Sequence, residues 1–375
     1  MMNFAERTGL TGERCPQRYL WTDAFAVCNF LGLAQLTGEC RYTELALRLV
    51  DQVHHNLGRH RDDDPRRGWI SGLSEREGEA HPTRGGLRIG KGLPERESHA
   101  PFDERLEWER DGQYFHYLIQ WMHALDQVAR ATGEARFNGW ARELAQTAYH
   151  AFTYLPATAA RRRRMVWKMS IDLSRPLVQS MGQHDPLDGY ITAVQLDSTA
   201  AQLPPSADAP RLGDEIQQYA AMLDASDWTT ADPLGLGGLL MDAYRVAQLM
   251  QQGARVRDGL LDELLAASHA GLQCYVSGGE LRRPAEYRLA FRELGLAIGL
   301  QAVERLHEFV GDAPLQALTR FVSVGAEIES FWRRPAHRRN PAWSEHRDIN
   351  EVMLATRLVP EGMLVLRSES ALGPS

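Results

Sequence analysis

TGECRYTELA at residues 37–46 and TGEARFNGWA at residues 132–141 decide the fold of this chain. Thr-Gly-Glu, an arginine, an aromatic residue and an alanine recur at the same positions in the two stretches, about 95 residues apart. Each stretch joins two segments with apolar residues at helical spacing, and a glycine at such a junction is typical of a helix end. Because sequence and helical context agree, the two stretches predict a repeated hairpin of two helices.

The helical pattern continues along most of the chain, whereas the alternation typical of strands is scarce. The best strand candidate is 165–173, as a short hairpin within a loop. Predicted helical hairpins occupy residues 18–58, 110–154, 186–224, 233–275 and 285–333, with a further helix near 346–358. Helices in hairpin order favour an all-α ring, an (α/α)6 toroid that spans residues 1–375 as a single domain. One helix is missing from six pairs, and a terminal segment is expected to supply it.

The segment 61–109 interrupts this rhythm. It is rich in Gly, Pro, Arg and Glu, and it contains the apolar stretch Gly68-Trp69-Ile70 and the glycine pair of 84–88. Loops of this length inside a domain are uncommon unless they are functional or disordered. We therefore expect a lid over one end of the ring.

Composition excludes several classes of protein. The chain of 375 residues is 43% hydrophobic and 24% charged, which is ordinary for a globular protein, and its net charge of −7 argues against nucleic-acid binding. There is no signal peptide and no apolar stretch of membrane-spanning length, so we expect a cytoplasmic protein. The four cysteines lack zinc spacing, and no metal or cofactor is expected. The glycines of 235–238 follow no strand, and we interpret them as a point of close helix approach.

The first helix of each predicted hairpin begins with carboxylates beside aromatic residues. A single carboxylate at such a position is typical of a helix N-cap. Several of them at one end of a ring would instead form a polar, aromatic pocket that suits a sugar, because aromatic rings stack on sugar faces. The residues predicted to line it are Trp21, Trp69, Trp108, Tyr114, His184, Trp343 and His346, with Arg288 and Arg347 available for an acidic substrate.

The repeated turn, the Trp-rich helix entries and the hairpin order resemble the six-hairpin glycosidases and, more distantly, the N-acylglucosamine 2-epimerase family. The resemblance to glycosidases implies a small carbohydrate substrate and two carboxylates, one a protonated acid and the other an ionised base. Asp111 and Glu351 are the predicted pair, without assignment of the two roles, and Asp188 is the reserve candidate. The expected activity is inverting hydrolysis of a glycosidic bond.

Two other functions remain open. The resemblance to the epimerases implies a pair of histidines, one on a late inner helix and one near the C-terminus. His346 matches the second position, but the helix at 287–298 carries no histidine, so His116 or His184 would have to serve. The remaining alternative is a non-catalytic sugar-binding or scaffold protein. The sequence does not indicate an oligomeric state.

Overall fold

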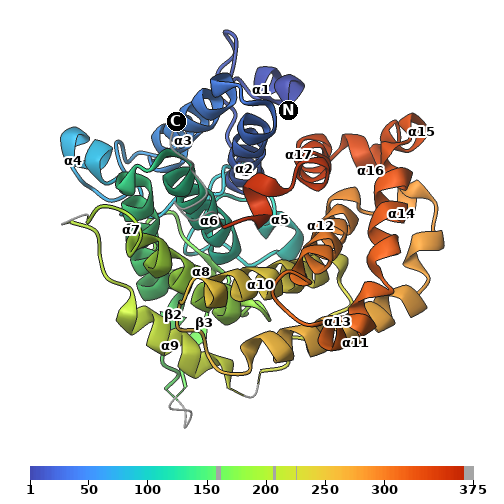
Figure 1. Ribbon diagram of the computed structural model, residues 1–375. Coiled ribbons are helices and arrows are strands. Elements are labelled where there is room, and N and C mark those ends of the chain that lie inside the picture. The colour runs from blue at the N-terminus through green and yellow to red at the C-terminus, as the bar shows by residue number, and fades with distance from the viewer. Residues whose placement is uncertain (158–161, 206–207, 225, 367–375) are drawn as a thin grey trace.

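The inner layer of the protein is a closed ring of six helices. The computed structural model describes residues 1–157, 162–205, 208–224 and 226–366. In ring order the inner helices are α2 (Leu20–Thr37), α6 (Phe115–Thr132), α8 (Asp185–Ala200), α10 (Pro233–Gln251), α12 (Ala290–Leu306) and α17 (Arg347–Leu358). Each packs against the next, and α17 packs back against α2 (Figure 1). The predicted (α/α)6 toroid is confirmed.

The outer layer supplies the second helix of each hairpin. Its helices are α3 (Cys40–Leu57), α7 (Ala135–Phe152), α9 (Gly213–Leu223), α11 (Leu260–Ser277) and the broken pair α13 (Asp312–Thr319) and α14 (Val322–Arg333). The partner of α17 is the N-terminal α1 (Met2–Arg7), which contacts it. The helix missing from the sequence pattern therefore comes from the N-terminal segment.

The two repeated stretches form matching turns between an inner and an outer helix. Gly38 and Gly133 both end their helices with φ 72°, a left-handed conformation that favours glycine. In each turn the threonine before the glycine accepts a hydrogen bond from the amide of the glutamate after it, at 3.2 Å. That glutamate pairs with the arginine two residues further on, at 2.8 and 2.9 Å. The predicted hairpin repeat thus has the same hydrogen bonds in both copies.

Inner and outer helices differ in how they are buried. In α2 every residue from Leu20 to Gly32 is buried, whereas α3 buries a single stripe. Helices α10 and α12 approach most closely at glycines: a Cβ on Gly237 would lie 2.2 Å from the carbonyl oxygen of Gly295. The interpretation of 235–238 as a point of close approach is confirmed at Gly237.

Short strands support the loops. The strands β1 (Gln113–Tyr114), β4 (Lys168–Met169) and β5 (Pro176–Val178) form one antiparallel sheet, and β2 (Thr153–Tyr154) pairs with β3 (Arg164–Met165). The predicted strand region 165–173 therefore contains β4 and the end of β3. Within the described part of the chain, no helix is long and apolar enough to cross a membrane.

The segment 61–109 wraps the outside of the ring and then reaches the end where the inner helices begin. It includes α4 (Glu75–Ala80) and α5 (Glu104–Glu107). Its first part lies on the outer helices, where Thr83 donates to a carbonyl of α7 at 2.8 Å. Its second part meets the starts of α2 and α6, since Ile89 accepts from the first amide of α2 at 3.0 Å. The lid role stays a prediction.

Candidate active site

One end of the ring is filled by the protein itself. The C-terminal segment 359–366, which contains α18 (Glu361–Leu364), lies in the middle of the ring (Figure 1). Gln127 of α6 donates to two of its carbonyls, at 2.7 and 3.0 Å, and Gln248 of α10 donates to a third at 2.9 Å. These glutamines lie towards the ends of their helices. A site inside the ring is therefore to be sought at the other end, where the inner helices begin, which we call the entry end.

A chain of ionisable side chains crosses the ring from α6 to α10 near the entry end. His116 Nδ1 lies 3.6 Å from Asp188 Oδ2 of α8, Asp188 is hydrogen-bonded to Asp242 of α10, and Asp242 lies 3.4 Å from Arg245. Although His116 lies among these helices, 35% of its side chain stays accessible. We call these four residues the His116 cluster.

The cluster separates the protonation states of its members. Burial lowers the pKa of His116, but the Asp188 carboxylate outweighs it, so the pKa lies above the ordinary value of 6.5. Burial raises the pKa of Asp188, and the adjacent imidazole more than compensates, so Asp188 is ionised. Burial and the charge of Asp188 raise the pKa of Asp242 well above its usual range. The direction of these shifts favours Asp242 as the protonated member of the pair, able to donate to Asp188.

Asp185, one turn before Asp188, adds a second weak acid. Burial first, and then the charge of Asp188, raise the pKa of Asp185 to about 7. Its carboxylate accepts from the Gly182 amide at 2.9 Å, which holds it at the start of α8. The cluster thus combines a histidine with carboxyl groups that differ in protonation at neutral pH, a typical arrangement for acid–base chemistry.

Aromatic side chains gather beside His116 at the entry end. The Tyr19 and Tyr117 hydroxyls are 2.6 Å apart, and the rings of Tyr117 and Tyr114 have centroids 5.3 Å apart. Trp108 packs on Tyr114 at 5.9 Å and on Trp167 at 5.2 Å. We call these five residues the aromatic rim.

Several residues predicted from the sequence belong to this end. Asp188 is in the His116 cluster, and Trp108 and Tyr114 are in the aromatic rim. His184 precedes α8, and its Nε2 is bonded to the Trp228 carbonyl at 2.9 Å.

Asp111 lies elsewhere than predicted. It was expected at the start of the second inner helix, but α6 begins at Phe115 and Asp111 lies in the loop before it, with 0% of its surface exposed. Its carboxylate accepts from Arg88 at 2.6 Å and from Arg61 at 3.2 Å, and the amides of Gly90 and Gly112 each donate to it at 3.0 Å. The expectation that Asp111 opens an inner helix is wrong, because the carboxylate organises the loop instead.

Glu351 lies in α17 but is engaged in ion pairs. It contacts Arg7 of α1 at 2.6 Å and Arg347 at 2.8 Å, so it links the terminal helix to the ring. Burial raises the pKa of Glu351, but the two arginines lower it by more, so the net pKa lies below its ordinary value. His346 occupies the N-cap position of α17 without a side-chain capping hydrogen bond, and its ring lies 5.7 Å from that of Phe291 at the start of α12.

Three other predicted residues are packed in the interior. Trp21 is buried against Phe25, with ring centroids 4.6 Å apart, and Trp343 is buried against Trp332 at 5.8 Å. Arg288 is buried and forms a bidentate pair with Glu293 at 2.7 and 2.8 Å. Their contacts in this structure are with the protein interior.

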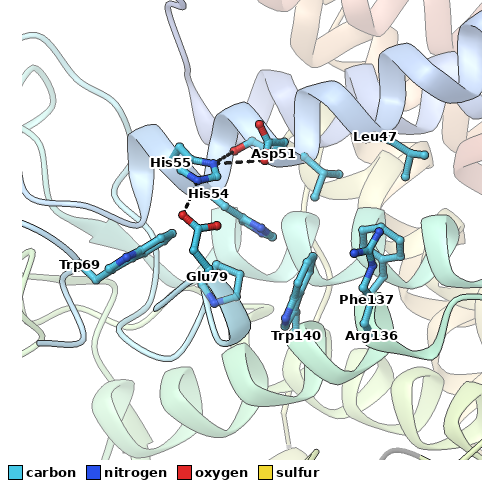
Figure 2. Close-up of a pocket in the computed structure, with 11 residues that line it drawn as sticks. Leu47, Asp51, His54, His55, Trp69, Glu79, Arg136, Phe137 and Trp140 are labelled. Atoms are coloured by element: carbon cyan, nitrogen blue, oxygen red, sulfur yellow. Dashed lines mark hydrogen bonds and ion pairs between the residues drawn. The ribbon is translucent and has the colours of Figure 1, made fainter. Parts of the chain in front are cut away.

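Trp69 lies outside the ring. Figure 2 shows it at one wall of a pocket between the outer helices α3 and α7, opposite Trp140. His55 in the same pocket contacts Glu79 at 2.8 Å. Only 2% of the Trp69 surface is exposed, because Arg59 stacks on the ring at 4.4 Å and the chain at Gly78 packs against it. The pocket is therefore separate from the entry end.

Known structures share this arrangement of helices. The chain is similar to a sugar epimerase from a ruminal bacterium, with a TM-score of 0.50 and 9% identity over 91% of this chain and 87% of that chain. The two proteins share their fold. It is also similar to cellobiose 2-epimerase from Spirochaeta thermophila DSM 6192, with a TM-score of 0.49 and 12% identity over 92% and 87% of the two chains. No protein-family model and no curated protein matches the chain.

At such low identity the likeness concerns the fold alone. It confirms the resemblance to six-hairpin ring proteins that was expected from the repeated turns. The residues that do the chemistry have to be argued from the entry end itself.

Proposed function

We propose that this protein is a carbohydrate-active enzyme of the epimerase or isomerase kind, which moves a proton at a carbon next to the carbonyl of an open-chain sugar. The observation that carries the proposal is the His116 cluster, an accessible imidazole backed by an ionised carboxylate at the entry end. A histidine with a pKa close to the working pH is suited both to take and to give a proton.

The chemistry assigned to His116 is removal of the carbon-bound proton. Neutral Nε2 would accept it, the C–H electron pair would form an enediolate, and Asp188 would stabilise the resulting imidazolium through Nδ1. A second group must return a proton to the carbon or its neighbour. His346 is the proposed partner, since it starts an inner helix at the same end of the ring and its ring packs against the start of α12. Exchange of both groups with water completes the cycle.

A glycoside hydrolase is the less favoured reading. An inverting hydrolase needs two carboxyl groups about 6.5–9.5 Å apart, with room for a water between them. Asp188 and Asp242 are instead hydrogen-bonded to each other, Asp111 is buried in loop contacts, and Glu351 is paired with arginines. These contacts favour histidine chemistry over the two-carboxylate mechanism.

Solvent exchange tests the proposal. The full chain is incubated in D2O with reducing sugars, among them glucose, mannose, N-acetylglucosamine and cellobiose, and NMR follows deuterium at C2 together with the epimer or ketose formed. We expect exchange with at least one sugar, and a loss of about 10²–10⁴-fold in His116→Asn because a general base is removed. His150→Asn is the control, since His150 is 67% exposed on the outer α7.

The alternatives give different results in the same experiment. Release of reducing ends from glycosides without carbon exchange would support a hydrolase. Binding of sugars to the wild type without either reaction would support a non-catalytic binding protein. Either result would overturn the proposed proton transfer.

A further inference from the structure

A second cavity, lined by cations, lies at the entry end beside the first turn of α2. Its volume is about 340 Å³, within the usual range for small-ligand pockets. Its lining includes three cationic side chains, Arg18, Arg88 and Lys91, and two side-chain amides, Gln17 and Asn56. No carboxylate stands among the described residues of its lining. We call this cavity the Arg18 pocket.

Arg18 is a buried cation with spare hydrogen-bonding capacity. Its guanidinium is fully buried, Nε donates to the Gln17 carbonyl at 3.0 Å, and one terminal nitrogen donates to the Thr8 carbonyl at 2.6 Å. The other terminal nitrogen has no hydrogen-bond partner in the described part of the protein, and its ion-pair contact, Asp23 Oδ1, is 3.6 Å away. Burying a charged group with an unused hydrogen-bond donor costs free energy unless a partner accepts that hydrogen bond.

Asp23 is a weak partner for this charge. It lies in the first turn of α2, and its other oxygen accepts from the Tyr19 amide at 2.9 Å. Burial raises the pKa of Asp23 to about 6, although Arg18 acts in the opposite direction. At neutral pH the Asp23 carboxylate is still mostly ionised, but its Oδ1 stays 3.6 Å from the Arg18 guanidinium, so the unused donor of Arg18 is open to a better-placed anion.

The other two cations of the pocket have different roles. Arg88 is fully engaged, since it donates to Asp111 and to the Arg59 and Asn56 carbonyls at 2.6–2.7 Å, and so it is a fixed wall. The Lys91 ammonium is held loosely, 4.0 Å from Glu109 and 5.5 Å above the Tyr19 ring. Lys91 and Arg18 thus each have a donor that is not committed to a close partner, and both residues line the same pocket.

We propose that the Arg18 pocket binds the oxyanion group, phosphate or carboxylate, of a small ligand. Tyr19 connects the pocket to the site, because it lies under Lys91 and its hydroxyl meets Tyr117, the neighbour of His116. Two sources supply this chemistry: an acidic group of the substrate itself, or a separate anion bound beside it. The proposal concerns binding and does not depend on the proton transfer proposed for His116.

Calorimetric titration of the full chain at low salt tests the pocket. The probes are inorganic phosphate, glucose 6-phosphate and glucuronate, with uncharged glucose for comparison. We expect at least one anionic probe to bind, more weakly as salt is added. In Lys91→Gln the dissociation constant should rise by about tenfold, because one charge-assisted hydrogen bond is lost. Arg18→Gln should weaken binding further, and circular dichroism checks its folding.

Arg41→Gln is the matched control. Arg41 is an exposed arginine with one ion pair to Glu39, in the turn at the opposite end of the same hairpin. If no anionic probe binds, or if Lys91→Gln binds as tightly as Arg41→Gln, the proposal is overturned. Lys91 is partly exposed, so its variant remains informative even if Arg18→Gln does not fold.

The two sources are then separated by competition. Phosphate is tested for competition with a sugar in the solvent-exchange assay, or in sugar binding if no exchange occurs. Competition identifies the pocket as the subsite for the substrate's own acidic group. Phosphate that binds without competition identifies a separate anion. Both results support the pocket, whatever the outcome for His116.

Discussion

Replacing Gly237 with alanine should strain the ring where α10 meets α12. The added Cβ would lie 2.2 Å from the carbonyl oxygen of Gly295, 2.4 Å from its carbonyl carbon and 2.8 Å from the Leu296 amide nitrogen. All three atoms belong to the backbone of an inner helix, so no side chain can rotate away. The two helices would have to separate by roughly 1 Å to restore ordinary van der Waals contact.

The magnitude follows from two opposing terms. Overpacking of this kind costs about 1–3 kcal/mol, while alanine is better than glycine within a helix by about 1 kcal/mol. Because backbone cannot yield, the overpacking cost should lie in the upper part of this range, about 2–3 kcal/mol, which leaves a net destabilisation of about 1–2 kcal/mol. Gly238→Ala is the matched control, since a Cβ there meets nothing within 4 Å. The control should gain about 0.4–1 kcal/mol from the lower entropy of the unfolded chain.

Scanning calorimetry measures the difference between the two variants. An unfolding entropy of about 2.1 cal/mol/K per residue gives a shift of roughly 1 °C per kcal/mol for a chain of this length. Gly237→Ala should therefore melt roughly 2–3 °C below Gly238→Ala. Equal melting temperatures, or a more stable Gly237→Ala, would refute the close approach of α10 and α12.

Three further predictions concern the interior of the ring. Asp188→Asn should remove the charge that stabilises protonated His116 and so lower the pKa of His116, which NMR titration measures. Asp242→Asn keeps a neutral donor and should change the pKa of His116 far less. Equal effects of the two variants would contradict the assignment of the proton to Asp242. Burial raises the pKa of Asp185 in the folded state to about 7, from an ordinary value of 3.8, so its contribution to stability is lost as pH rises through this interval. Chemical denaturation should therefore show that Asp185→Asn gains stability relative to the wild type between pH 5 and pH 8. A variant that tracks the wild type at both pH values would show that Asp185 titrates normally. Gln127→Leu removes the donor from the buried Gly362 carbonyl and from the partly buried Val365 carbonyl, at a cost of about 1–3 kcal/mol for the buried group. The segment 359–366 should then exchange its amide hydrogens faster, and unchanged exchange would show that other contacts hold it.

Local sequence signals were sufficient to predict the helical hairpins that form the ring. The glycine turns at Gly38 and Gly133 depend on backbone conformation, which a short motif specifies. The apolar periodicity predicted the five complete hairpins because amphipathic spacing reports directly on which helix face is buried. The helix α1 has only six residues, too few for a periodic pattern, and only its contact with α17 identifies it as the missing partner.

The candidate site was only partly accessible from sequence. Asp188, Trp108 and Tyr114 were found because they occur at helix entries, and His116 was named only as a substitute. Asp242 was missed, although an acid within the apolar run of α10 is itself a signal of a buried polar contact. Trp167 was missed because it is far in sequence from the other residues of the aromatic rim. It directly precedes β4, and the pairing of β4 with β1 places it next to Trp108 and Tyr114.

The error over Asp111 has a physical cause. Three residues separate Asp111 from the start of α6, and the sequence alone does not show that the chain from Arg88 to Lys91 folds around its carboxylate. A buried acid surrounded by arginines and amides is a structural element that depends on distant loop segments. Such a contact has no local pattern and cannot be distinguished from a catalytic acid by composition.

His123 and His116 show how position within the ring decides what a histidine does. They lie seven residues apart on α6, two turns along the same face. Both nitrogens of His123 are occupied, by Gln195 at 3.2 Å and by the Met363 carbonyl at 2.9 Å, and burial lowers its pKa to about 3. It is a neutral structural group under the C-terminal segment. His116, beyond that segment, contacts an ionised carboxylate and keeps accessible surface. The C-terminal segment therefore satisfies the polar groups at its own end of the ring, and this is why the proposed acid–base chemistry is assigned to the entry end.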